Sequence, residues 1–241
     1  MRRPIGSTPR GQRPKRPGHH RRPGHHRSTG ADTAHHRRGR SRSAPVPIGC
    51  FATGGARGPI GSSTNYDGDG DAADDILTMS SSGDVWTLHA HWAAGGSASA
   101  TVPDVGIGAR PLGGHDLDGD GSDEAFVVLE GPTGVTILVF RTDGCGLEPV
   151  IDDASGALFG FPITQGIGHF AGATCTGIGH IDLVAGELVD AATGLYEAGF
   201  VPYDLGRDGR IRAGFGDGAV LDAAEVGAHA RLGCGSLPSS P

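Results

Sequence analysis

The chain has 241 residues and a mass of 24.4 kDa, which is enough for one large domain or two small ones. Its 44 glycines and 16 prolines favour turns and leave few uninterrupted stretches for long helices, which argues against a helical bundle. Residues 1–43 hold 13 of the 20 Lys and Arg residues, so the rest of the chain is strongly acidic. This charge disfavours binding to a phosphate backbone and favours divalent cations as partners.

Residues 1–46 are predicted to form a disordered tail, because they repeat Arg-Pro-Gly-His-His-Arg at 16–21 and 22–27 and show no apolar periodicity. Arg-rich arms can bind nucleic acid, but the many Pro and Gly residues and the missing aromatics favour a solvated tail. No apolar signal-peptide region follows the basic start, so either the protein stays inside the cell or its start is misassigned. No apolar run approaches the ~20 residues of a membrane-spanning helix, and we expect no membrane span.

Residues 47–237 are predicted to form one repeat domain, whose most informative feature is an acidic loop that occurs twice. The first copy is Asp67-Gly-Asp69-Gly-Asp71-Ala-Ala-Asp74-Asp75, and the second is Asp116-Leu-Asp118-Gly-Asp120-Gly-Ser122-Asp123-Glu124. Carboxylates at positions 1, 3 and 5 of a tightly bent loop converge on one point, and such hard oxygen ligands suit Ca²⁺. An EF-hand would place an acid at position 12, where this chain has Thr78 and Val127.

The repeated spacing therefore predicts two calcium sites, each with a carboxylate at position 9 and a backbone carbonyl at position 7 as further ligands. The predicted ligands are Asp67, Asp69, Asp71, Ala73 and Asp75 in the first loop and Asp116, Asp118, Asp120, Ser122 and Glu124 in the second. We expect the first loop to bind calcium more weakly, because Ala72 replaces the glycine at position 6. In addition, the ligand positions of this loop could be counted from Asn65 instead of Asp67. Asp123, at position 8, is expected to point away from the ion.

Short apolar or alternating runs on both sides of a turn follow each loop and predict β-hairpins. The expected hairpins span residues 76–92, 125–140 and 183–201, and a weaker fourth unit spans 203–215. The stretch before the third hairpin lacks the spaced Asp residues of the two acidic loops. The chain is therefore predicted to be all-β, with about three to four antiparallel hairpin repeats, of which two have calcium loops.

At these residues the chain resembles the FG-GAP/VCBS repeats of integrin-type β-propeller proteins, in which DxDGDGxxD leads into the inner strand of a blade. Residues 114–124 match that pattern best, and the resemblance covers roughly residues 60–215. It implies a β-propeller-like array with calcium-braced loops and a role in binding or adhesion. Family propellers commonly have seven blades, so three or four units would have to close through neighbours, the C-terminal segment or another chain.

The four cysteines occur in no CxxC motif, which excludes a zinc knuckle or a thioredoxin-like site. Their even number and wide spacing predict disulfides and an oxidising compartment. The expected pairs are Cys145–Cys175, which closes a short loop, and Cys50–Cys234, which ties the ends of the domain together. Four buried free thiols are the alternative.

His89 and His91 form an HxH pair that strand alternation places on one face, as in some zinc sites. Apolar residues occupy the opposite face, so we expect both imidazoles to face solvent without a metal. His115, beside the second loop, is expected to be a turn residue.

No GxSxG, SxxK or P-loop motif occurs. The chain is therefore predicted to be a non-enzymatic, calcium-stabilised binding module, located outside the cell or at its surface. Its expected partner is an unknown protein or glycan, and self-association could complete the propeller. A secreted hydrolase or lyase on a β scaffold, and a nucleic-acid binder acting through the Arg-rich tail, are the alternatives.

Overall fold

The computed structural model describes residues 61–103, 106–143 and 146–239. The predicted tail at residues 1–46 lies outside these ranges, as do Cys50 and Cys145. The elements are, in chain order, β1 (Gly61–Ser63), β2 (Ile76–Ser82), β3 (Val85–His91), β4 (Ser97–Val102), β5 (Gly108–His115), β6 (Glu124–Gly131), β7 (Gly134–Asp143), β8 (Gly146–Pro149), β9 (Ile151–Asp152), β10 (Gly160–Gly166), β11 (His169–Gly177), β12 (His180–Asp190), β13 (Leu195–Leu205), β14 (Arg210–Ala213), β15 (Asp217–Leu221), α1 (Ala223–His229) and β16 (Leu232–Gly233).

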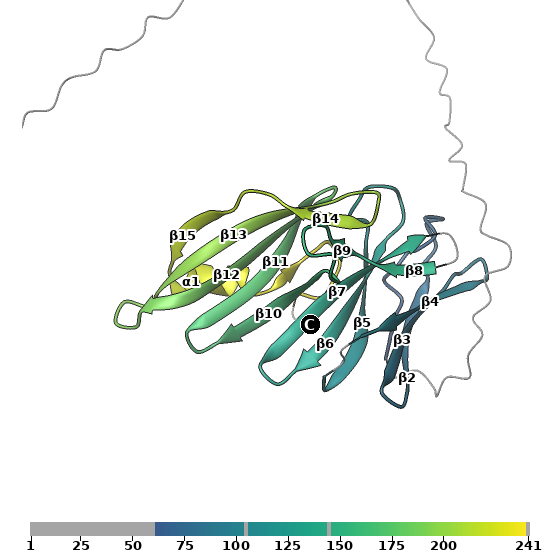
Figure 1. The fold of residues 1–241 in the computed structure, drawn as a ribbon, viewed down its shortest axis with the longest axis horizontal. Coiled ribbons are helices and arrows are strands. Elements are labelled where there is room, and N and C mark those ends of the chain that lie inside the picture. The colour runs from purple at the N-terminus through teal and green to yellow at the C-terminus, as the bar shows by residue number, and fades with distance from the viewer. Residues whose placement is uncertain (1–60, 104–105, 144–145, 240–241) are drawn as a thin grey trace, which may run out of the picture. The chain divides into compact units, whose positions relative to one another are not determined.

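These strands form two mainly antiparallel sheets (Figure 1). The smaller sheet has the order β1-β2-β3-β4, and the larger one runs β5-β6-β7-β10-β11-β12-β13-β14-β9. Three further strands join the larger sheet, since β8 pairs with β7, β15 with β13, and β16 runs parallel to β11. The prediction of an all-β fold is therefore confirmed.

The three predicted hairpins are all present as antiparallel pairs, namely β2–β3, β6–β7 and β12–β13. The weaker fourth unit corresponds to the pairing of β13 with β14. The hairpins are not separate blades, however, because β10 pairs with both β7 and β11 and so joins the second and third hairpins into one sheet. Within the described residues the strands show no closed barrel or propeller.

The second hairpin is buried on both faces, which explains its continuous apolar sequence. On β6, Ala125 and Val127 pack toward the smaller sheet, against Leu77 and Leu88 among others. The alternate residue Phe126 joins a second core cluster on the other face. The first hairpin instead alternates between buried and more exposed residues, because only one of its faces meets a core.

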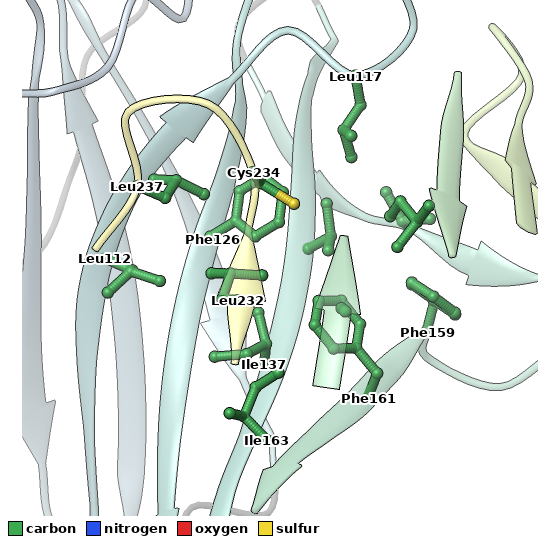
Figure 2. Close-up of a cluster of buried hydrophobic side chains, with 14 of the residues drawn as sticks. Leu112, Leu117, Phe126, Ile137, Phe159, Phe161, Ile163, Leu232, Cys234 and Leu237 are labelled. Carbon is green, nitrogen blue, oxygen red and sulfur yellow. The ribbon is translucent and has the colours of Figure 1, made fainter. Parts of the chain in front are cut away.

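The C-terminal segment fills the second of these clusters (Figure 2). Leu232, Cys234 and Leu237 are almost completely buried there, beside side chains from β6, β7 and β10. The helix α1, which precedes this segment, covers a third cluster through Val226. The C-terminal segment is thus an integral part of the core of the larger sheet.

The structure contains a disulfide between Cys175 at the end of β11 and Cys234 just after β16, with a Cα–Cα distance of 4.7 Å. Both predicted pairs, Cys145–Cys175 and Cys50–Cys234, are therefore wrong. The physical reason is the parallel pairing of β16 with β11, which brings Cys234 next to Cys175. The general prediction of disulfides is confirmed for this pair.

Candidate metal centre

The first acidic loop connects β1 to β2, and it brings three predicted ligands together. Carboxylate oxygens of Asp67, Asp69 and Asp71 all lie within 4.8 Å of one another, an arrangement that could hold a metal ion. The side chains are half-buried. Burial, and then the neighbouring Asp71, raises the pKa of Asp69. A cation at this point would offset the repulsion between the carboxylates.

The second acidic loop connects β5 to β6 and has the same geometry. Carboxylate oxygens of Asp116, Asp118 and Asp120 again lie within 4.8 Å of one another. Burial, followed by the nearby Asp120, raises the pKa of Asp118. Both triplets thus combine converging hard oxygen donors with like-charge repulsion, which are the properties of a site suited to Ca²⁺.

Backbone hydrogen bonds hold the carboxylates in the same way in both loops. The N–H at position 6 donates to the position 1 carboxylate, from Ala72 to Asp67 at 2.9 Å and from Gly121 to Asp116 at 3.2 Å. Two further shared bonds run from the position 5 N–H to the position 3 carboxylate and from the position 7 N–H to the position 5 carboxylate. The two loops therefore share one conformation despite their different sequences.

One oxygen of the first triplet has no hydrogen-bond partner. Oδ2 of Asp69 is buried without a donor, although Oδ1 accepts the N–H of Asp71. Burying a carboxylate oxygen costs free energy unless it contacts a cation or a hydrogen-bond donor. This oxygen, together with the acid-only donor set, fits a hard divalent cation.

The two carboxylates at position 9 are placed differently from the triplets. Asp75 and Glu124 are almost completely buried, and each accepts the backbone N–H of position 2, from Gly68 at 2.9 Å and from Leu117 at 2.7 Å. Asp75 also accepts the N–H of Ala93 at 2.8 Å. In the structure these two side chains brace the loop backbone, and their part in metal binding stays a prediction.

Burial dominates the ionisation of both position 9 side chains. It raises the pKa of Asp75 to about 6 against the two backbone hydrogen bonds, which lower it. It raises the pKa of Glu124 to about 8, and the nearby carboxylates of the second loop add to that increase.

The backbone carbonyls at position 7, those of Ala73 and Ser122, also remain predicted metal ligands.

Direct contacts join the two loops, and the sequence of either loop alone gave no sign of them. The N–H of Asp67 donates to Oδ2 of Asp123 at 2.9 Å, and the N–H of Asp123 donates to the carbonyl of Asp67 at 2.7 Å. A Cβ at Gly70 would lie 2.8 Å from the carbonyl oxygen of Gly121, so the loops are closely packed. The side chain and backbone of Asp123 therefore connect the two loops.

The turn before the third hairpin packs on the second loop. The N–H of Gly179 donates to the carbonyl of Leu117, and the side chain of Ile178 leaves no space for a Cβ at Gly119. The sequence of the third unit lacks the spaced Asp residues of the two acidic loops. Its turn thus contacts the second loop through backbone and apolar atoms.

The histidine pair lies on the outward face of the smaller sheet. Nε2 of His89 is 2.9 Å from the hydroxyl of Ser80, and Nε2 of His91 is 3.4 Å from the hydroxyl of Thr78. Burial, with a contribution from His91, lowers the pKa of His89. Among the described residues neither histidine belongs to a metal-binding group of three.

Ala72 has a left-handed backbone with φ of 66°, and its counterpart Gly121 has φ of 97°. A non-glycine residue in this region is strained by roughly 1–2 kcal/mol, although glycine costs more entropy on folding. Ala72→Gly is therefore expected to raise the free energy of unfolding by about 0.5–1 kcal/mol, measured by urea denaturation in EDTA. The matched control is Gly121→Ala, which should lower the free energy of unfolding. A Cβ at this position meets nothing within 4 Å, so the loss would come from the left-handed backbone alone. Equal stabilities of all three proteins would contradict this account of the first loop.

Comparisons of the chain with protein-family models, with curated proteins and with solved structures gave no match. The resemblance to FG-GAP/VCBS repeats therefore depends on the sequences of the two loops. Among the described residues, no helix is both long and apolar enough to cross a membrane.

Proposed function

We propose that the chain is a non-enzymatic binding module of FG-GAP/VCBS type, stabilised by calcium and acting outside the cell or at its surface. The observation that carries the proposal is the pair of Asp triplets, which share one pattern of backbone hydrogen bonds and contact each other. Its ligand is a protein or a glycan that recognises the loop surfaces, since specificity in such modules lies in loops.

Calcium would supply charge neutralisation at the loops when bound. The residues that would hold it are the two triplets, with the position 7 carbonyls and the position 9 carboxylates as additional donors. The chain itself already positions the carboxylates through the backbone N–H groups of each loop. Because Asp123 connects the two loops, an ion bound in either loop would also stabilise the contact between them.

An extracellular location is part of the same proposal and is supported by the disulfide between Cys175 and Cys234. Disulfides persist in oxidising compartments and are rare in the cytosol. The interpretation of the three hairpins as repeats of one unit also belongs to this proposal, with the second and third joined by β10 into one continuous sheet. Its support is the recurrence of the acidic loop before two of the hairpins.

The proposal predicts that calcium raises the melting temperature. If the second loop binds with a Kd near ~10 µM, then ~1 mM Ca²⁺ stabilises the native state by about 2.7 kcal/mol. For a domain of this size the melting temperature should rise by roughly 5–10 °C. Calorimetric scans in EDTA and in calcium measure this shift, and Mg²⁺ should replace Ca²⁺ poorly because it requires a tighter octahedral shell.

Two variants make this experiment specific. Asp120→Ala removes a carboxylate of the second triplet and should abolish most of the calcium-dependent shift, while Asp71→Ala should cost less because the first loop is strained at Ala72. The control is Asp74→Ala, an exposed residue outside the triplets, which should keep the full shift. Identical melting temperatures in EDTA and in millimolar calcium would refute the proposal.

A further inference from the structure

The strand β15 is an open edge of the larger sheet (Figure 1). It pairs with β13 on one side, and among the described strands nothing pairs with its other side. Its sequence, Asp217-Gly-Ala-Val-Leu221, contains no Lys, Arg or Pro, the residues that commonly protect edge strands. The free backbone N–H and C=O groups of β15 are therefore available to pair with another extended polypeptide.

Large apolar side chains are exposed at this edge. Val220 in β15 is 62% exposed, and Phe215, two residues before the strand, is fully exposed. The first four residues of β15 are all exposed. The edge thus combines unpaired backbone groups with apolar surface, which together indicate a protein interface.

The face of β15 that carries Val220 also has open space above two glycines, Gly218 and Gly199. Val220 lies opposite Glu197 on β13, and two residues away Gly218 lies opposite Gly199. A Cβ at Gly199 would meet nothing within 4 Å, and one at Gly218 would meet only the carbonyl oxygen of Ala198, at 3.6 Å. Gly199 also lines an apolar groove of about 280 Å³ that continues across β10 to β13.

We propose that β15 pairs antiparallel with β15 of a second copy of this chain, about a two-fold axis at Ala219. In that register Val220 of each copy lies opposite Gly218 of the other, because antiparallel partners are symmetric about the axis. Each valine side chain then fills the open space above Gly218 and Gly199 of the other copy. A shift of the register by one residue would place Val220 opposite Ala219 and lose this fit.

This inference goes beyond the proposed function, since no residue of the acidic loops takes part. Sedimentation velocity of the full chain, over a wide concentration range in calcium-containing buffer, is expected to show a reversible dimer. Hydrogen exchange should detect slower exchange of amides in residues 217–221 at dimer-forming concentrations. Protection elsewhere without protection of β15 would overturn the proposal, even if the protein dimerises.

Val220→Lys should weaken the dimer about tenfold or more, because it places a charge opposite Gly218 of the second copy. Phe215→Ser should weaken it less, since the residue lies outside the strand. Val189→Lys, at a residue that is 58% exposed on the interior strand β12, is the matched control and should leave dimerisation unchanged. A wild-type protein that stays monomeric, or a dimer insensitive to Val220→Lys while melting temperatures are unchanged, would refute the proposed interface.

Discussion

Replacing both Cys175 and Cys234 with alanine is expected to lower the free energy of unfolding by about 4 kcal/mol. The disulfide joins residues that are 59 positions apart, and a cross-link of that span restricts the unfolded chain strongly. Urea denaturation of the wild-type and the double variant measures the difference. A loss of less than ~1 kcal/mol would show that the cross-link does not restrict the unfolded chain as the chain-entropy account of disulfides requires.

The disulfide fixes a segment that contributes to the core, which adds to the expected loss. Leu232 and Leu237 are buried on either side of Cys234 (Figure 2). Ser236 exchanges two hydrogen bonds with Asn65, which precedes the first acidic loop, at 2.8 and 3.1 Å. As a control, a reductant should destabilise the wild-type protein, and any effect that remains in the double variant reports on Cys50 and Cys145.

The hairpins could be predicted from the sequence because their signals are local. Alternation of apolar residues and glycine-containing turns identified β2–β3, β6–β7 and β12–β13. The pairing of β10 with β7 could not be found in this way, since it depends on contacts between distant segments. The same holds for the disulfide, because the return of β16 beside β11 leaves no local mark in the sequence.

The candidate site was also predicted only in its local part. Positions 1, 3 and 5 converge as the spacing indicated, because a tight turn determines where those side chains lie. The role of Asp123 was missed, since its partner Asp67 lies in the other loop.

Glu124 gives the second large effect, because it is the most strongly perturbed carboxyl group of the second loop. Its pKa is raised from 4.5 to about 8, mainly by burial. The native protein therefore holds a proton on Glu124 at pH values where the unfolded chain has released it. This contribution to stability is fully present below the unfolded pKa and is lost as pH rises through the folded one, so it declines between about pH 4.5 and 8.

Glu124→Gln keeps a carbonyl oxygen that can accept the N–H of Leu117 but removes the ionisable group. In EDTA the variant and the wild-type protein should have similar stability near pH 5, and the variant should be more stable by several kcal/mol near pH 8. Urea denaturation across this pH range measures the difference. Asp74→Asn is the control, because it alters an exposed carboxylate that is not among the groups acting on Glu124, and it should leave the pH dependence of the wild-type protein intact.

Calcium then separates the two roles of Glu124. If Glu124 is a ligand, calcium stabilises its ionised form, so the wild-type protein should lose its stability decline toward pH 8 and the Glu124→Gln variant should show a reduced calcium-dependent rise in melting temperature. If the side chain only braces the backbone of Leu117, the variant should keep the full calcium-dependent rise. In EDTA, the wild-type protein and Glu124→Gln could instead have equal stability at pH 5 and at pH 8. That result would show that the carboxyl group of Glu124 ionises normally and that burial does not raise its pKa.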